Sequence, residues 1–369
     1  MVNLKFNIAF IGFGTVGQGL AQILTEKKDF LKSKLGFEYN VVAISDINKG
    51  SVAYEKGLDM LKILHLARKT GTILGYEFGQ KGLSSVETIQ ESNADIIVEV
   101  TWTDLETGNP GLMHIKKSLT AREHVVTTNK GPIALAYHEL KQIAEKYDVF
   151  LRFEGTVLSG TPTFSLSSEG LAGANIRSVK GILNATTNQI LTEMERGRSF
   201  EEALKKVQML GYAESNPTMD IDGWDAAAKV TILANVMMKG NVNVKEVERS
   251  GIGEISPDDI MRARRAKGKI RLVAEARREN REVKARVLPQ IVPLKNIFAH
   301  VNGNLNALTI ATDVLGDVTV IGPGAGGREA GYALLNDMLA IERALMVSSK
   351  NLKQRPNDRK TPCRLRANS

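Results

Sequence analysis

The residues best suited to chemistry lie between Gly211 and Lys229, in the string GYAESNPTMDIDGWDAAAK. Asp225 and Lys229 are four residues apart, so on a helix they share one face, with the acid nearer the N-terminus. A lysine held among carboxylates can transfer a proton or bind a polar ligand. By itself, an Asp–Lys pair at this spacing is more often an ordinary surface ion pair. The acids of this stretch are Glu214, Asp220, Asp222 and Asp225.

The composition around this string predicts a loop that enters a helix. Asn216-Pro217 and Asp222-Gly223 are turn signals, and helix formers follow from Trp224 onward. A helix over about 199–210 is expected to precede the loop. The candidate lysine is therefore expected near the start of a helix whose entrance is rich in acids.

A glycine-rich turn near the N-terminus predicts dinucleotide binding. Residues 6–17 read FNIAFIGFGTVG, an apolar strand followed by the pattern G-x-G-x-x-G and then by an amphipathic helix. Gly12 permits a tight turn, Gly14 lets the backbone approach a pyrophosphate, and Gly17 lets the helix pack on the strand. The alternative is a glycine-rich strand–helix turn that binds no ligand.

Asp46 follows the second predicted strand, over residues 41–45. An acid at this position accepts hydrogen bonds from the adenosine ribose of NAD. Lys49 and Lys56 lie just beyond it and could instead meet the 2′-phosphate of NADP. The pattern leaves the choice between NAD and NADP open.

Two more polar residues follow predicted strands. Thr101 comes after the apolar strand over 94–100, and Lys130 comes after the strand and turn that begin at residue 124. Ligands of open α/β sheets bind at such carboxyl ends. Strand–helix alternation through about residue 150 predicts an α/β fold with a doubly wound parallel sheet.

Length and composition are those of an ordinary globular protein of two domains, with 369 residues, 43% hydrophobic and 24% charged. The one cysteine, Cys363, excludes a disulfide framework and fits a cytoplasmic location. No apolar run approaches the roughly 20 residues of a spanning helix, so we expect no membrane contact.

The net charge of +8 could suggest a nucleic-acid partner. However, residues 351–369 hold six basic side chains and one acid, which is +5 of that charge. We expect this tail to be disordered. No zinc-finger spacing or aromatic nucleic-acid-binding motif is present, so no nucleic-acid partner is expected.

Three further segments carry polar groups or irregular structure. The glycine- and threonine-rich turn over 150–163, with Glu154 beside it, could offer backbone oxygens to a hard cation, or serve only as a hinge. Residues 184–188 form a small polar cluster suited to hydrogen-bonding a compact ligand. Residues 255–300 are expected to form short helices and strands.

Several of these segments, in the same order, resemble those of homoserine dehydrogenases over roughly residues 5–345. The resemblance implies reversible NAD(P)-dependent hydride transfer between L-homoserine and L-aspartate 4-semialdehyde, on the route to threonine and methionine. The segments are GFGTVG, IIVEVT, HVVTTNKGP, FEGTV, GILN with TTN, the 211–229 string and GPGAG.

The resemblance also implies an architecture. A Rossmann-type domain over residues 1–155 is expected to be completed by residues 310–348. A second, α+β domain over 156–309 is expected to bind substrate and to form a homodimer. The chain ends without a C-terminal regulatory domain, so feedback control by threonine through such a domain is not expected.

The roles of individual residues follow from the same resemblance. Lys229 is expected to exchange the proton, with Lys130 as the second lysine and Asp220 as a supporting acid. The expected substrate-binding residues are Glu214, Asp225, Tyr212 and Thr186. The expected cofactor-binding residues are Gly12, Phe13, Gly14, Thr15, Val16, Gly17, Asp46, Thr101, Lys130, Gly211, Glu214 and Gly326. A structural sodium ion is expected at Glu154, Val157, Ser159 and Thr161.

The sequence departs from the family pattern at two positions beside the expected substrate pocket. The family usually has glycine where Ala185 stands and tyrosine where Gln189 stands. One alternative is therefore a related dehydrogenase of another small alcohol or aldehyde. The other is a non-catalytic NAD(P)-binding paralogue, against which the retained acids and lysines speak.

Overall fold

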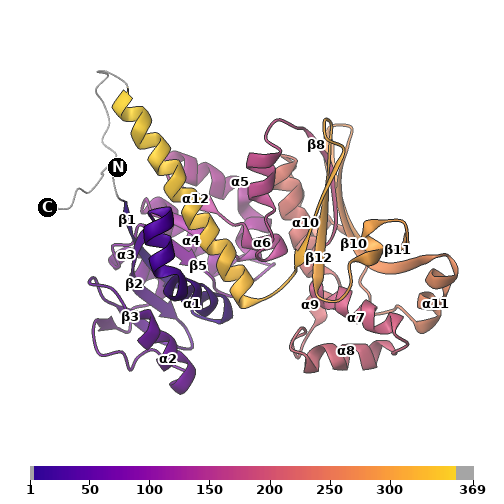
Figure 1. Cartoon of the computed structure of the whole chain (residues 1–369), viewed down its shortest axis with the longest axis horizontal. Helices are drawn as coiled ribbons and strands as arrows, with labels where there is room; N and C mark the ends of the chain where they lie inside the picture. The colour runs from indigo at the N-terminus through magenta and orange to yellow at the C-terminus, as the bar shows by residue number, and fades with distance from the viewer. Residues whose placement is uncertain (1–3, 355–369) are drawn as a thin grey trace.

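The computed structural model describes residues 4–354, with side chains as far as residue 347, and contains two β-sheets with helices packed on and between them (Figure 1). Over the described residues the first sheet has seven strands in the order β4-β3-β2-β1-β5-β6-β7. Five strands are parallel, and β3 and β4 are antiparallel at one edge. The strands are β1 (Lys5–Ile11), β2 (Glu38–Asp46), β3 (Gly50–Ala53), β4 (Gln80–Lys81), β5 (Ile96–Glu99), β6 (His124–Thr127) and β7 (Leu151–Arg152).

Helices cover both faces of this sheet, because successive residues of a buried strand point to opposite faces. Ile8 and Phe10 of β1 pack toward α1, α2 and α12, whereas Ala9 and Ile11 pack toward α3, α4 and α5. The doubly wound α/β sheet predicted from the sequence is therefore confirmed. The helices are α1 (Thr15–Phe30) with η1 (Leu31–Leu35), α2 (Met60–Thr70), α3 (Ser85–Glu91), α4 (Gly111–Thr120), α5 (Lys130–Tyr147) and α12 (Gly327–Gln354).

The second sheet is mixed and mostly antiparallel, with the order β13-β12-β8-β10-β11-β9 in the described part of the chain. Its centre is a long hairpin of two twelve-residue strands, where the sequence had indicated only short elements. Residues 310–323, expected to help complete the first domain, lie in β12 and β13 of this sheet, so the return to the first sheet begins at α12. The strands are β8 (Ile176–Ile182), β9 (Glu248–Arg249), β10 (Gly268–Glu279), β11 (Glu282–Pro293), β12 (Leu305–Thr312) and β13 (Asp317–Pro323).

Shorter helices surround the second sheet and connect it to the first (Figure 1). The helix expected over about 199–210 is present as α8, at 200–209. The elements are α6 (Gly155–Leu158), η2 (Leu166–Gly170), α7 (Ala185–Glu195), α8 (Phe200–Met209), α9 (Thr218–Ile221), α10 (Trp224–Met237), η3 (Val244–Glu246), α11 (Pro257–Arg265) and η4 (Ile297–His300).

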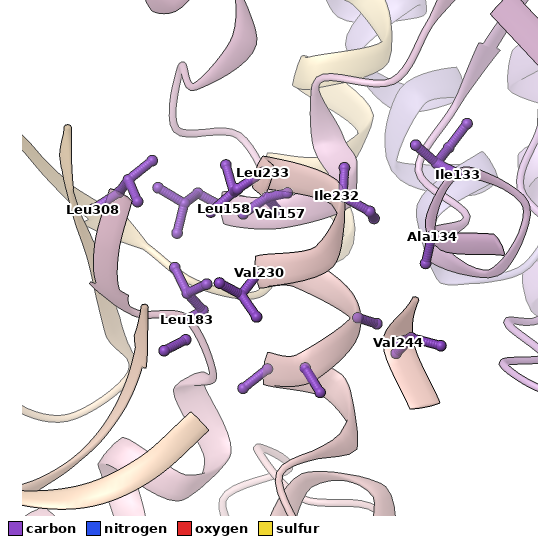
Figure 2. Packing of buried hydrophobic residues seen from close by; sticks show 14 of the residues in the cluster. Ile133, Ala134, Val157, Leu158, Leu183, Val230, Ile232, Leu233, Val244 and Leu308 are labelled. Atoms are coloured by element: carbon purple, nitrogen blue, oxygen red, sulfur yellow. The ribbon is translucent and has the colours of Figure 1, made fainter. Parts of the chain in front are cut away.

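Helix α10 is the central helix of the structure. Residues 226–235 are all buried, and the helix packs against α5 and α6 on one side and β10 and β11 on the other. Figure 2 shows Val230 pointing toward Leu183, whereas Ile232 points away from it. A helix that is apolar all round belongs in a core rather than on a surface. A buried charge on α10 is therefore unfavourable unless it is paired inside the protein.

Glycines allow α1 and α12 to cross with their backbones in contact. A Cβ atom on Gly19 would lie 2.2 Å from the backbone oxygen of Gly327, and one on Gly331 would lie 2.5 Å from the nitrogen of Leu20. A Cβ on Gly327 would likewise lie 2.5 Å from Cγ2 of Thr15. The second glycine-rich turn is therefore held directly against the first.

The predicted basic tail lies almost wholly outside the described residues. Residues 351–354 extend α12, and 355–369 fall beyond the part that is described. Within residues 4–354, none of the helices combines the length and the apolar character that crossing a bilayer requires.

Candidate active site

Lys229 and Asp225 form an ion pair inside the protein. Lys229 Nζ lies 2.7 Å from Asp225 Oδ2 and also donates to the backbone oxygen of Leu183 at 2.7 Å. Because Lys229 is only 7% exposed, the pair is not an ordinary surface ion pair. An ammonium group has three N–H donors. The described residues supply two acceptors, so one donor of Lys229 is left for a ligand.

Lys130 reaches the same carboxylate from the first sheet. It is the first residue of α5, directly beyond β6, and its Nζ lies 3.3 Å from Asp225 Oδ1. The Asn129 side chain caps α5 by accepting a hydrogen bond from Gly131 N at 3.2 Å, which fixes the turn between strand and helix. The two lysines, one beside each sheet, therefore meet at one aspartate.

Asp220, on α9, lies beside this group. Its pKa is shifted in the opposite direction to that of Asp225. Burial and the neighbouring charge of Asp225 raise the pKa of Asp220 above its usual value. Burial also acts to raise the pKa of Asp225, but the ammonium groups of Lys229 and Lys130 outweigh it and hold that pKa well below its usual range. Asp225 therefore stays ionised, while Asp220 is the acid that takes up a proton more readily.

The loop after α8 borders the charged group. The Thr186 hydroxyl donates to the backbone oxygen of Tyr212 at 2.8 Å, which ties the loop to α7. Gly211 adopts a φ of +74°, a conformation that favours glycine. Glu214 is exposed on this loop, and the contacts described for it run from Gln208 to its backbone oxygen. The substrate and cofactor roles of Glu214 thus remain a prediction.

The first glycine turn has space where a pyrophosphate would bind. A Cβ on Gly12 would lie 2.6 Å from the oxygen of Val100, and one on Gly17 would lie 2.8 Å from the oxygen of Gly12. A Cβ on Gly14 would meet no heavy atom within 4 Å. Close packing at the two outer positions and open space at the middle one fit the geometry of a nucleotide turn. Gly326, with a φ of +139°, precedes α12 on the second turn.

Asp46 is fastened to this turn. Its Oδ2 accepts a hydrogen bond from Phe13 N at 2.7 Å, and its Oδ1 accepts from the backbone nitrogens of Asn48 and Lys49 at 2.9 Å each. Phe13 is fully buried, and its backbone oxygen accepts a hydrogen bond from the Gln18 side chain at 3.0 Å, so its cofactor role stays a prediction. Thr15 is exposed at the start of α1, and Val16 is partly buried.

Glu99 organises the next strand end, and the sequence analysis had not singled it out. Its side chain is fully buried and accepts hydrogen bonds from the Thr101 amide at 3.1 Å and from the Thr101 hydroxyl. Its second oxygen accepts from the Thr127 hydroxyl at 3.1 Å. The signal available in the sequence was an acid, Glu99, within the apolar run that follows Asp95.

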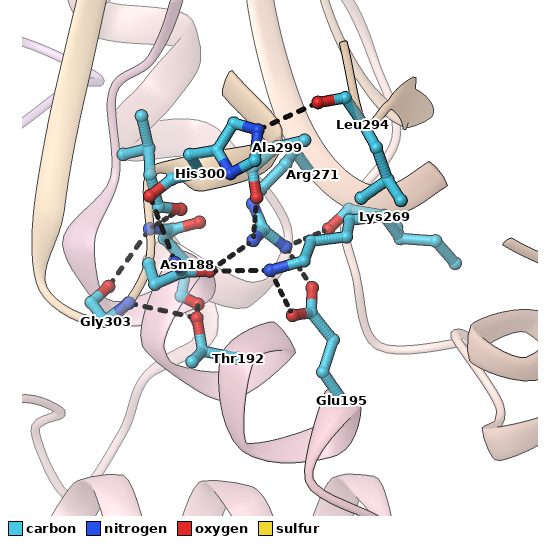
Figure 3. Close-up of polar contacts among 12 residues, drawn as sticks. Asn188, Thr192, Glu195, Lys269, Arg271, Leu294, Ala299, His300 and Gly303 are labelled. Atoms are coloured by element: carbon cyan, nitrogen blue, oxygen red, sulfur yellow. Dashed lines mark hydrogen bonds and ion pairs between the residues drawn. The ribbon is translucent and has the colours of Figure 1, made fainter. Parts of the chain in front are cut away.

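The side-chain nitrogen of Asn188 is engaged within the protein, and the ligand-binding role of residues 184–188 stays a prediction. Its amide donates to three backbone oxygens of the loop before β12, at 3.1 Å each (Figure 3). The fully buried Arg271 holds the other end of α7 through an ion pair with Glu195. Gln189 is also buried, and its amide donates to Glu193 at 3.4 Å. These contacts anchor α7 on the second sheet. The three oxygens are those of Val301, Gly303 and Leu305.

In the turn predicted to bind sodium, the Glu154 carboxylate accepts hydrogen bonds from the backbone. Glu154 is buried and accepts hydrogen bonds from the backbone nitrogens of Thr163, Phe164 and Ser165. The backbone oxygen of Thr161 accepts from the Thr163 hydroxyl at 3.2 Å. In the described part of the chain, no group of three or more His, Cys, Asp or Glu side chains could hold a metal. The candidate ligands that remain are backbone oxygens, including those of Val157 and of Ser159, whose φ is +53°.

A Rossmann-type sheet, a glycine turn with open space at Gly14 and a buried lysine held by acids are together the features of an NAD(P)-dependent oxidoreductase. The family model for homoserine dehydrogenase matches residues 162–339. The homoserine dehydrogenase of Methanocaldococcus jannaschii is 43% identical over 336 residues, which are 91% of this chain and 98% of that protein. The chain therefore belongs to the homoserine dehydrogenase family.

Other comparisons agree with this assignment. The NAD(+)-dependent homoserine dehydrogenase of Pseudomonas canavaninivorans is 38% identical over 92% of this chain and 97% of its own length. The crystal structure of a putative homoserine dehydrogenase from Archaeoglobus fulgidus matches 91% of this chain and 99% of its own, with 35% identity and a TM-score of 0.82. A hyperthermophilic archaeal homoserine dehydrogenase in complex with NADPH matches 92% and 98%, with 32% identity and a TM-score of 0.80.

The ion pair predicts a strong effect of Asp225 on stability. Replacing Asp225 by Asn leaves two lysines without their shared counter-charge, and we expect the free energy of unfolding at pH 7 to fall by about 3–5 kcal/mol. The control Asp222→Asn changes an exposed acid three residues away and should alter it by less than about 0.5 kcal/mol. Urea unfolding monitored by circular dichroism measures both values.

The pH dependence has a defined sign. Because folding lowers the pKa of Asp225, its contribution to stability is complete above the ordinary aspartate pKa of about 4 and declines as pH falls toward the depressed value. The difference between the wild type and Asp225→Asn should therefore shrink below about pH 4. If Asp222→Asn lowered the free energy of unfolding at pH 7 as much as Asp225→Asn does, the structural role given to Asp225 would be contradicted.

Proposed function

We propose that this chain catalyses the reversible oxidation of L-homoserine to L-aspartate 4-semialdehyde with NAD(P). The observation that carries the proposal is the remaining N–H of Lys229, at a buried site where two lysines share one aspartate. A donor in that position suits an oxygen that changes between hydroxyl and carbonyl. Membership of the homoserine dehydrogenase family supports the choice of substrate.

In the proposed reaction, bound NAD(P) supplies or accepts the hydride at the carbon that carries this oxygen. In the direction of reduction, the Lys229 ammonium donates its proton to the oxygen as the oxygen becomes an alkoxide. Asp225 holds Nζ in place at 2.7 Å, so little reorientation is needed when charge develops. Lys130 adds a second positive charge beside the same carboxylate and is positioned to stabilise the developing negative charge.

The carboxylates on the other side of the site suit the substrate ammonium group. Glu214, on the exposed loop, and Asp220, on α9, are the acids that we assign to substrate binding and support. Thr186 and Tyr212 join that loop to α7 and so set the edge of the pocket.

Lys229→Ala tests the proposal directly. We expect kcat to fall by about 10²–10⁴-fold, because the proton donor is lost. The affinity for NAD(P)H, measured by fluorescence, should stay the same because the glycine turns are intact. Lys245→Ala, at an exposed position, is the matched control and should keep full activity. Turnover of homoserine by Lys229→Ala at the wild-type rate would end the proposal.

We infer further that the coenzyme is NAD in preference to NADP. The Asp46 carboxylate is held by three backbone nitrogens at the end of β2, where it suits ribose hydroxyls and repels a 2′-phosphate. The wild type should therefore have the higher kcat/KM with NAD. In Asp46→Ser the ratio of the two kcat/KM values should move toward NADP by roughly tenfold, equivalent to about 1.4 kcal/mol. A wild-type preference for NADP would overturn this inference.

We also propose a homodimer formed through the outer face of the second sheet. Helix α10 covers one face, whereas the other exposes Ile321 at 43% and an exposed hydrogen bond between Thr309 and Thr319. Light scattering should give twice the mass of one chain, and Ile321→Arg should give the mass of one chain. A wild-type protein with the mass of a single chain would contradict the dimer.

Two smaller proposals rest mainly on the family resemblance. A monovalent cation such as sodium would be held by the backbone oxygens of Val157, Ser159 and Thr161, because the Glu154 carboxylate is already engaged. A cytoplasmic location is supported by the single cysteine among 369 residues.

A further inference from the structure

We propose that Asn184 is a positioning residue, whose side-chain amide holds the carboxylates of Asp220 and Asp225 in fixed relation to each other and so keeps Asp225 against both lysines. Asn184 Nδ2 lies 2.6 Å from Asp220 Oδ1 and 2.8 Å from Asp225 Oδ2. An amide nitrogen carries two N–H donors. Each carboxylate therefore receives one of them.

The orientation of the amide is determined by the other end of the same group. Asn184 is the N-cap of α7, and its Oδ1 accepts a hydrogen bond from Thr187 N at 2.8 Å. Because the backbone N–H can only donate, the amide oxygen must face the helix and the two donors must face the acids. Helix α7 is itself anchored by Asn188 and Arg271 (Figure 3). The amide is thus held in place rather than free to rotate.

The amide donates to the same oxygen of Asp225 that pairs with Lys229. Oδ2 of Asp225 receives Lys229 at 2.7 Å and Asn184 at 2.8 Å, while Oδ1 faces Lys130 at 3.3 Å. The charged groups that face the amide are Asp220 from α9, Asp225 and Lys229 from α10, and Lys130 from α5. Without the two donors, the carboxylates of Asp220 and Asp225 would repel each other, and Asp225 would lose one of its hydrogen bonds.

The pKa shifts of Asp220 and Asp225 agree with the position of the Asn184 amide between them. Asp225 is kept ionised between the lysines, while the pKa of Asp220 is raised by burial and by the charge of Asp225. The hydrogen bond from Asn184 opposes the rise at Asp220 and adds to the lowering at Asp225. Removing its donors should therefore move the titration of the acid pair to higher pH.

The substitutions Asn184→Asp and Asn184→Ser separate this role from helix capping. Asp, Ser and Asn are about equally good N-caps, so α7 should keep its stability. Neither replacement supplies the two amide donors. We expect kcat for homoserine to fall by about tenfold or more in Asn184→Ser and further in Asn184→Asp, which adds a third carboxylate. The acidic limb of the pH–kcat profile should shift to higher pH, with NAD(P)H affinity unchanged.

Asn243→Ser is the matched control, because it makes the same substitution at the exposed N-cap of η3, where the side-chain oxygen accepts a hydrogen bond from Lys245 N at 3.0 Å. This variant should retain the wild-type profile. Because the inference rests on the proposed function, the outcomes must be distinguished. An inactive wild type would overturn the proposed function. An active wild type with folded Asn184 variants of equal kcat and an unshifted profile would overturn only the role of Asn184.

A second measurement does not depend on activity. In urea unfolding, Asn184→Ser should be less stable than the wild type at neutral pH, and this difference should shrink below the ordinary aspartate pKa of about 4, because the missing donors stabilise ionised carboxylates. Asn243→Ser should show no such pH-dependent difference from the wild type. Coincident curves for the wild type and Asn184→Ser would overturn the proposal even if homoserine is not the substrate.

Discussion

A positive charge placed inside a protein must be met by a negative one, and this constraint governs the architecture around Lys229. The ammonium group sits on a helix whose residues 226–235 are all buried. Asp225, one turn earlier, supplies the compensating charge, and the carbonyl of Leu183 supplies a second acceptor. Had Asp225 been lost, burial of the lysine would be strongly unfavourable. The Asp225–Lys229 pair is therefore required for the stability of the fold, whatever its role in catalysis.

The same aspartate connects the two halves of the molecule. Lys130 projects from the end of β6 in the first sheet, and Lys229 projects from the helix that packs on the second sheet. Their convergence explains why α10 is placed between α5 and the long hairpin. A site built at such a junction can receive a nucleotide from one side and a small substrate from the other.

Glycine contacts hold the two glycine-rich turns beside the first sheet together. The crossing of α1 and α12 allows no side chain at Gly19 or Gly331, so the two glycine turns cannot separate without losing the packing of both helices. Asp46 and Glu99 then tie the strand ends to these turns through backbone hydrogen bonds. On the second sheet, Arg271 and Asn188 do the same for α7, on which Asn184 stands.

The sequence by itself determined those features that depend on local pattern. The strand–turn–helix at Gly12–Gly17, the spacing of Asp225 and Lys229, and the alternation of strands and helices all follow from short-range rules of backbone and side-chain geometry. Tertiary structure alone decided that Lys130 meets Asp225 across 95 residues of chain. It also decided that Asn188 binds loop carbonyls, that Glu99 supports Thr101, and that residues 310–323 join the second sheet. The physical reason is that these outcomes depend on which strand ends and helix faces meet in three dimensions, and no local periodicity encodes that meeting.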